Sequence, residues 1–107
     1  MKRKPAVAGS FYPGQGAALR RMIAQMIDPA APKVKAKAVV SPQAGYMYSG
    51  PVAGAVFGSV QIPKECVILC PTHRGIRSMF ALMSEGSWEM PLGGYYDLPL
   101  TGRYINI

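Results

Sequence analysis

Two short apolar runs, each followed at once by a proline-containing loop, constrain the fold of this chain more than any other feature. The first run is residues 38–40, with the loop SPQAGY after it, and the alternating residues 33–37 lead into it as part of the same expected strand. The second run is residues 66–70, followed by PTHRG. A helical pattern separates the runs, so we expect a strand, helix and strand with a parallel crossover. Parallel strands end at one edge of a sheet, where open α/β folds place ligand sites. Gln43 and His73 are therefore candidate neighbours at that edge.

The spacing of apolar residues predicts two helices around these strands. Between residues 16 and 27, apolar side chains recur at helical intervals, and Pro29 follows. A second helix is expected to begin at Ser49-Gly50-Pro51, because proline is tolerated in a first helical turn, and to end before Pro63. Its small residues would allow close approach to a sheet. We therefore predict an α/β fold in which two helices flank a partial, mainly parallel sheet.

The rest of the chain gives weaker signals. Residues 5–13 combine two adjacent aromatics with flanking prolines and are expected to form an extended, docked arm. Residues 80–83 are a candidate third strand, residues 88–93 are expected to be a loop, and residues 94–107 have no clear helical period. The apolar run that ends at Cys70 has no polar alternation after Glu65, as is typical of a strand covered on both faces.

The 107 residues have room for one small domain, and half of them are apolar. The apolar runs are far shorter than the roughly 20 residues that span a bilayer, and no signal peptide is recognisable, so we expect no membrane segment. On one strand, Cys66 and Cys70 would lie roughly 13 Å apart, too far for a disulfide. Buried thiols in a reducing cytoplasm are the favoured interpretation, and metal ligation by Cys70 is the alternative.

The net charge of +7 comes mainly from the first sixty residues, which contain eight basic residues and one acidic residue. Such a bias can attract anionic partners, including nucleic acid, through a nonspecific field. The basic residues are dispersed, however, and do not alternate with aromatic residues as a base-stacking surface requires. We therefore do not expect nucleic acid to be the partner.

A few side chains in the two loops could take part in chemistry or binding. His73, the only histidine, could ligate a metal or accept a proton, or it could simply bond to backbone or water. Gln43 cannot exchange protons near neutral pH and is better explained by structural hydrogen bonding. Tyr46 and Tyr48 could line a pocket or pack at the core's edge, and Arg74 could hold an anion or be solvated. No pair of carboxylates indicates acid–base work, so no catalytic residue is assigned.

Three motifs together resemble the MEMO family over about residues 3–93. They are RKPAVAGSFYP at 3–13, SPQAGYMYSGP at 41–51 and ILCPTHRG at 68–75. The resemblance implies a fold similar to that of the class III extradiol dioxygenases, of which this chain would form the N-terminal portion. The family's human relative mediates ErbB2-driven cell motility. Many prokaryotic members are associated with AMMECR and radical-SAM partners in the AmmeMemoRadiSam system.

The resemblance also implies a metal pocket, from which this chain departs. In the family a histidine stands at the position of Gln43, and it joins the histidine that matches His73 and later His and Cys residues around iron or copper. Here glutamine replaces that histidine, and the later ligands would lie beyond residue 107. We therefore expect no cofactor in this chain alone, although iron or copper is implied by the family.

The last residues depart from the family as well. Residues 1–93 are expected to be the N-terminal part of a MEMO-like domain, and residues 94–107 a divergent tail that arises from a reading-frame change near Gly93 or Gly94. We expect a truncated protein that is non-catalytic or has an uncharacterised binding function. The alternative is a metal-dependent redox or dioxygenase-like enzyme whose site is completed by another chain. The expected partners are a second copy of the chain or an AMMECR or radical-SAM protein.

Overall fold

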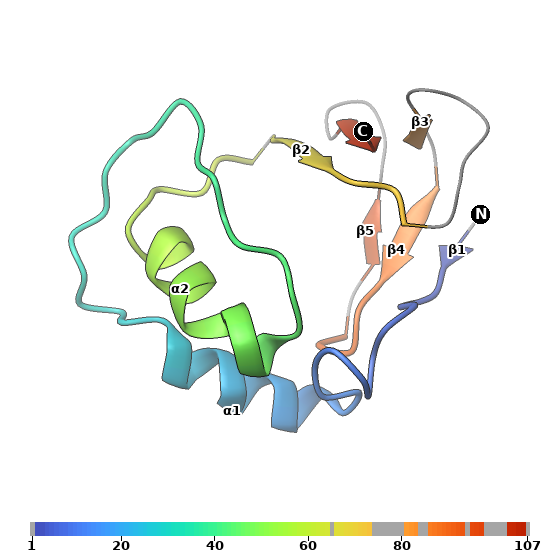
Figure 1. Cartoon of the computed structure of the whole chain (residues 1–107), viewed down its shortest axis with the longest axis horizontal. Coiled ribbons are helices and arrows are strands. Elements are labelled where there is room, and N and C mark those ends of the chain that lie inside the picture. The colour runs from blue at the N-terminus through green and yellow to red at the C-terminus, as the bar shows by residue number, and fades with distance from the viewer. Residues whose placement is uncertain are drawn as a thin grey trace. The chain divides into compact units, whose positions relative to one another are not determined.

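The computed structural model describes residues 2–64, 66–73, 81–83, 86–93, 95–97 and 103–106 (Figure 1). The chain divides into two compact units. The helical unit consists of Pro5–Ile62 with Met90–Gly94, and the strand unit consists of Met1–Lys4, Pro63–Glu89 and Tyr95–Ile107. Each unit is described by itself.

The helical unit begins with a tight turn and continues into the first helix, α1 (Gly16–Met26). The turn includes Gly9, whose φ of 85° lies in the left-handed region that glycine adopts without strain. Helix α1 confirms the predicted 16–27 helix to within one residue. Its Leu19 is 1% exposed, whereas Arg20 and Arg21 are exposed to solvent, so the amphipathic pattern sets the face of α1 that is buried.

The second helix, α2 (Tyr46–Gly58), begins three residues before the predicted start, so Pro51 lies inside it. The Tyr46 N–H donates to the Phe11 carbonyl at 2.8 Å, and the Gly45 carbonyl accepts from the N–H of Tyr48 at 2.9 Å. The first turn is therefore already closed upstream of Pro51. The prediction of a helix that starts at residues 49–51 was wrong. It took Ser49 or Gly50 as the N-cap and Pro51 as a residue of the first turn, whereas the acceptor for the first N–H comes from a distant segment.

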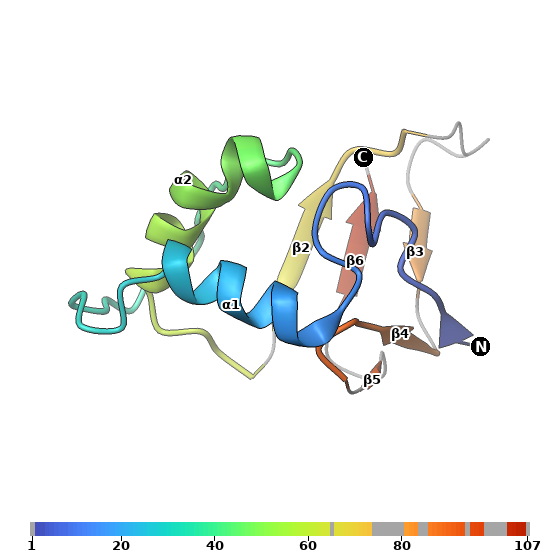
Figure 2. The same cartoon turned by 90° about the horizontal axis from the view of Figure 1, so that it is seen from below.

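Helix α2 packs on α1 through a face made only of glycine. Gly50, Gly54 and Gly58 recur at intervals of four, and all three are buried against the end of α1. A Cβ at Gly54 would lie 2.8 Å from the Met26 carbonyl carbon, and one at Gly58 would lie 3.3 Å from Ile27 Cγ2. The small residues of α2 thus allow close approach to a helix, where the sequence suggested a sheet. Both views show the two helices side by side (Figures 1 and 2).

The long connection between the helices does not contain the predicted first strand. Residues 38–40 form no regular structure, and Val40 is 92% exposed. Within the predicted stretch 33–40, Val34 forms an isolated bridge to Val60 in parallel, with the Val34 N–H bonded to the Ser59 carbonyl at 2.9 Å. A strand needs a neighbour for its N–H and C=O groups. Among the described residues, 38–40 have no ladder partner, so their apolar pattern alone did not make a strand.

The strand unit contains two three-stranded sheets. In the first, β4 (Ser87–Glu89) lies between β1 (Lys2–Arg3), which is parallel to it, and β5 (Tyr95–Asp97), which is antiparallel. In the second, β6 (Arg103–Asn106) lies between β2 (Val67–Cys70), parallel to it, and β3 (Ala81–Met83), antiparallel (Figure 2). Helices and parallel pairing together confirm the α/β class, and each sheet also includes an antiparallel pair.

Several expectations for this unit can be compared with the structure. Strands β2 and β3 confirm the predicted second and third strands. Residues 88 and 89, expected to belong to a loop at 88–93, instead lie in β4. Strand β2 was expected to be covered on both faces, yet Val67, Ile68 and Leu69 are exposed, because the described part of this unit places no helix over it. The expectation of buried thiols also fails, since Cys66 is exposed and Cys70 only half-buried. Among the described residues, no helix is long and apolar enough to cross a membrane.

Candidate functional site

The first two sequence motifs meet at the start of α2. The Phe11 carbonyl accepts the hydrogen bond from Tyr46 N–H, and the rings of Tyr12 and Tyr46 lie 5.4 Å apart at an interplanar angle of 42°. Gly45 lies close to both segments, because a Cβ there would be 3.6 Å from the Phe11 carbonyl oxygen and 3.6 Å from Tyr48 Cδ2. The N-terminal arm therefore contacts the first turn of α2, which contains Tyr46 and Tyr48.

Ser49 fixes the loop that leads into α2. Its hydroxyl oxygen accepts a hydrogen bond from the Ala44 N–H at 3.1 Å, and its O–H lies 3.2 Å from the Ala44 carbonyl as a donor. A serine near a helix start commonly satisfies backbone groups in this way. These bonds attach the loop backbone at Ala44 to the first turn of α2.

The Tyr12–Tyr46 pair affects the acidity of the Tyr12 phenol. Burial raises the pKa of the Tyr12 phenol above its ordinary value, and the nearby Tyr46 phenol raises it further. The Tyr12 phenol therefore stays protonated near neutral pH and can donate a hydrogen bond. The Tyr12 hydroxyl can orient a polar ligand group but does not supply a base.

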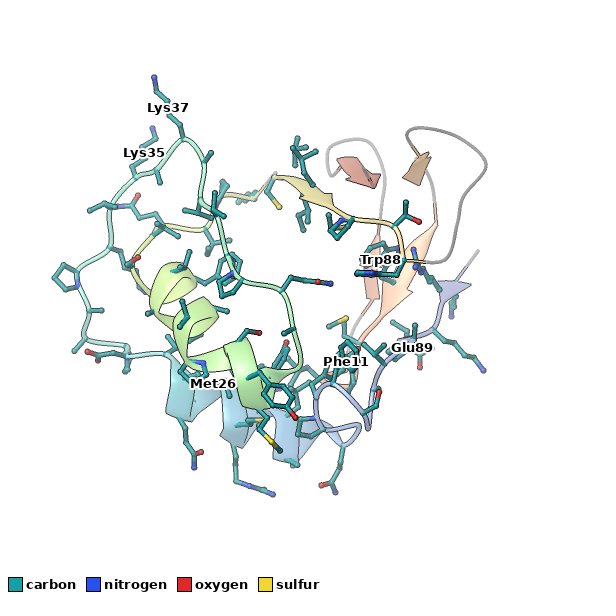
Figure 3. All side chains as sticks on the ribbon, in the orientation of Figure 1. Phe11, Met26, Lys35, Lys37, Trp88 and Glu89 are labelled. Atoms are coloured by element: carbon teal, nitrogen blue, oxygen red, sulfur yellow. The ribbon has the colours of Figure 1, made fainter. Side chains whose placement is uncertain are left out.

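Helix α2 presents large side chains to solvent at its start. Tyr48 is 82% exposed, Met47 is 77% exposed, and Phe11 beside them is also exposed. We call these three residues the aromatic edge. Gln43 is exposed on the preceding loop. Of the predicted pocket residues, Gln43, Tyr46 and Tyr48 thus lie within one short segment, with Tyr46 in a ring contact and Tyr48 in solvent. Phe11 is labelled near the start of α2 in Figure 3.

The third motif begins inside β2 of the strand unit and continues past it. His73, three residues after the end of β2, is exposed, and Thr72 beside it is half-buried. Arg74, a predicted pocket residue, lies outside the described residues. Gln43 belongs to the helical unit and His73 to the strand unit. Their expected proximity at one sheet edge stays a prediction.

Phe11 and Tyr12 were not among the residues expected to form the site. The only signal for them was the pair of adjacent aromatics in an arm flanked by proline, which indicated docking without showing onto what. Their role became visible through the carbonyl of Phe11 and the ring of Tyr12, which both contact Tyr46. These are contacts between segments about thirty-five positions apart, and no local pattern encodes them.

The residues that the structure describes do not supply a ligand set for the iron or copper that the family resemblance implies. Within the described ranges, no three side chains of His, Cys, Asp or Glu gather in one place. Protein metal centres usually use three or four such ligands, and an uncharged amide such as that of Gln43 is a weak ligand for transition metals. His73 alone does not make a site, and we derive no reaction step through a metal.

The arrangement therefore defines an α/β protein in which the N-terminal arm contacts the tyrosine-containing first turn of α2. Comparison with known proteins makes this more specific. The family model described as "Memo-like protein" matches residues 3–99. The chain belongs to the Memo-like protein family. No solved structure matches it.

Three curated relatives illustrate the similarity. A MEMO1 family protein of Methanothermobacter thermautotrophicus is 45% identical over 105 residues, which cover 87% of this chain and 38% of the relative. Those of Aquifex aeolicus and Thermotoga petrophila are 39% and 40% identical, with 85% and 100% of this chain and 34% and 43% of the relative covered. The chain thus spans less than half the length of each. The family match extends to residue 99, and the predicted divergent tail at 94–107 stays a prediction.

Proposed function

We propose that this chain is a binding protein that recognises a polypeptide partner through the aromatic edge and performs no chemistry by itself. The observation that carries the proposal is the position of this edge. Phe11, Met47 and Tyr48 are exposed, while the backbone beneath them is fixed by the Tyr46–Phe11 hydrogen bond and by Ser49. Aromatic residues and methionine are enriched in protein interfaces, and a surface that is ordered in advance loses less entropy on binding.

The chemistry of the loops supports binding over catalysis. Gln43 stands where the family resemblance expects histidine, and its amide neither exchanges protons near neutral pH nor ligates transition metals well. His73 is one exposed imidazole, so an iron- or copper-dependent redox enzyme would need further ligands from another chain. This enzyme is the competing proposal.

Metal analysis of the untagged protein separates these functions. We expect iron, copper and zinc well below one equivalent per chain, with no difference between the parent and a His73→Ala variant. A stoichiometric metal that disappears in His73→Ala would refute the binding proposal and favour the enzyme. The variant should keep the helical circular dichroism of the parent, because His73 is exposed at the end of β2.

Association in solution is the second part of the proposal. A second copy of the chain is one partner class, because an unfinished sheet edge and exposed apolar surface favour association. AMMECR or radical-SAM proteins in the cytoplasm are the partner class that the family resemblance suggests. Light scattering at several protein concentrations measures self-association directly. Titration with purified AMMECR or radical-SAM proteins, followed by Tyr48→Ala and Met47→Ala variants, tests the others. Loss of binding in these two variants is the expected result if the aromatic edge is the contact.

A further inference from the structure

The contact between α1 and α2 places a sulfur atom directly against a glycine. Helix α1 ends at Met26, which is labelled where the two helices meet in Figure 3. Its side chain reaches the glycine face of α2, which consists of Gly50, Gly54 and Gly58. A Cβ at Gly50 would lie 2.6 Å from both the Sδ and the Cε of Met26. The thioether therefore fills the space that glycine leaves, and no further heavy atom fits between them.

Hydrogen bonds attach α2 to the helical unit near its two ends. At the start, Tyr46 N–H bonds to the Phe11 carbonyl, and at the end the Lys33 ammonium bonds to the carbonyl of Gly58. Between these points the glycine face packs on α1, and the atoms closest to the Cβ positions of its first two glycines belong to Met26. The middle of α2 therefore relies on Met26 for its close contact with α1.

Met26 is also accessible to a small oxidant. Its side chain is half-buried, whereas Leu19 on the same helix is enclosed. Peroxides oxidise the thioether of methionine to a sulfoxide, which is polar, and the reductases for methionine sulfoxide reverse the reaction. With hydrogen peroxide, one oxygen forms a bond to Sδ while the O–O bond breaks, and sulfur gives up two electrons. The departing hydroxide takes the proton of the transferred oxygen and leaves as water.

We infer that Met26 is a redox-sensitive contact that holds the middle of α2 on α1 when reduced and releases it when oxidised. The sulfoxide oxygen needs hydrogen-bond donors, but the N–H groups inside a helix are already bonded within it. The oxidised side chain therefore turns toward solvent, and the glycine face loses the atoms that fill it. This switch acts on the fold and does not rest on the proposed binding function.

Graded oxidation of the 107-residue chain with hydrogen peroxide tests the inference. Peptide mass spectrometry locates each added oxygen, and hydrogen exchange measures the protection of the α2 amides. Once Met26 is a sulfoxide, we expect the amides of residues 50–58 to exchange about fivefold faster or more, because the middle of α2 opens locally. The Tm should fall by about 5 °C. Treatment with methionine sulfoxide reductases and a thiol reductant should restore both values.

Two variants isolate Met26 from the other methionines. Met26→Leu keeps an apolar side chain of similar size that forms no sulfoxide, so peroxide should change its Tm by less than about 1 °C. Met47→Leu is the matched control, because Met47 lies on the same pair of helices but is 77% exposed. Met47→Leu should respond to peroxide as the parent does. The remaining methionines are present in all three proteins, so the difference between them reports on Met26.

Three results would overturn the inference. The first is a sulfoxide at Met26 with unchanged exchange in α2. The second is an equal loss of Tm in the parent and in Met26→Leu. The third is a Met26 that stays reduced after Met47 has been oxidised completely. If Met26→Leu does not fold, the parent alone decides: chains oxidised at Met47 only are separated from chains oxidised at both positions, and only the latter should show faster exchange in α2 that the reductases reverse.

Discussion

The two helices of this chain bury their faces by opposite means. In α1, side chains mark the buried face: Leu19 is enclosed, and the arginines lie on the other side. In α2, the absence of side chains marks it: Gly50, Gly54 and Gly58 let the backbone approach the end of α1, and the apolar side chains point elsewhere. A hydrophobic pattern therefore reveals the orientation of α1 and conceals that of α2.

This difference separates two sources of stability. The side-chain face of α1 gains free energy from burying apolar area, whereas the glycine face of α2 gains it from close backbone packing. Variants that affect one source and leave the other intact measure each contribution separately.

The largest effect is expected when Leu19 is shortened. Leu19→Ala removes the one large side chain that is fully buried among the described residues, and it leaves a cavity in a small core. We expect the free energy of unfolding to fall by about 3 kcal/mol. Urea denaturation followed by circular dichroism measures this loss. Ala17→Gly, an exposed change on the same helix, should cost about 1 kcal/mol from helix propensity alone.

Gly54→Ala should have the next largest effect. The added Cβ would meet the Met26 backbone, which cannot move aside, so we expect a loss of about 2 kcal/mol despite the better helix propensity of alanine. Gly58→Ala is the matched control, since its Cβ would come only within 3.3 Å of one side-chain methyl, Ile27 Cγ2, which a shift of a few tenths of an ångström relieves. Gly58→Ala should change stability by less than about 1 kcal/mol. If both variants melt alike, the glycine face does not hold α2 on α1.

Lys33→Met addresses how α2 ends. The Lys33 ammonium donates a hydrogen bond of 2.7 Å to the Gly58 carbonyl, one of the last acceptors of α2, where a positive charge also favours the helix dipole. Its removal should lower the free energy of unfolding by about 1 kcal/mol. Lys35→Met, on the same exposed connection, serves as control. An equal loss in both variants would show that the effect is one of net charge.

The smallest effect concerns alkaline pH. Because burial and Tyr46 raise the pKa of Tyr12 in the folded chain, the folded chain binds this proton more tightly than the unfolded chain does. The resulting stability is fully present below the ordinary pKa of 10.0 and is lost as the pH rises through the folded value. Tyr12→Phe should therefore show a smaller drop in Tm between pH 8 and pH 11 than the parent. A drop of the same size would exclude this contribution.

The sequence predicted the elements whose determinants are local. The amphipathic period around Leu19 gave α1 to within one residue, and the apolar run before Cys70 gave β2. The start of α2 could not be predicted, because the acceptor for Tyr46 N–H is the carbonyl of Phe11. Residues 38–40 failed as a strand for a related reason: their composition favours extended backbone, but ladder partners are a property of the whole fold.

The candidate site was predictable to a similar extent. Gln43, Tyr46 and Tyr48 share one segment, so their common location followed from the sequence. The contribution of Phe11 and Tyr12 depends on tertiary contacts and was missed. The proximity of Gln43 to His73 depended on a strand at residues 38–40, which the structure does not contain. The proximity of Gln43 and His73 therefore stays a prediction, without the strand from which it was argued.

The bridge between Val34 and Val60 has a consequence for how the chain tolerates cleavage. It attaches the middle of the long connection to the end of α2, through bonds from Val34 N–H to Ser59 and from Gln61 N–H to Val34. Lys35 and Lys37 lie just beyond it on the exposed bend (Figure 3). Trypsin that cuts at these lysines would leave α1 and Val34 on one fragment and α2 on the other, and the glycine face would keep the nicked halves together.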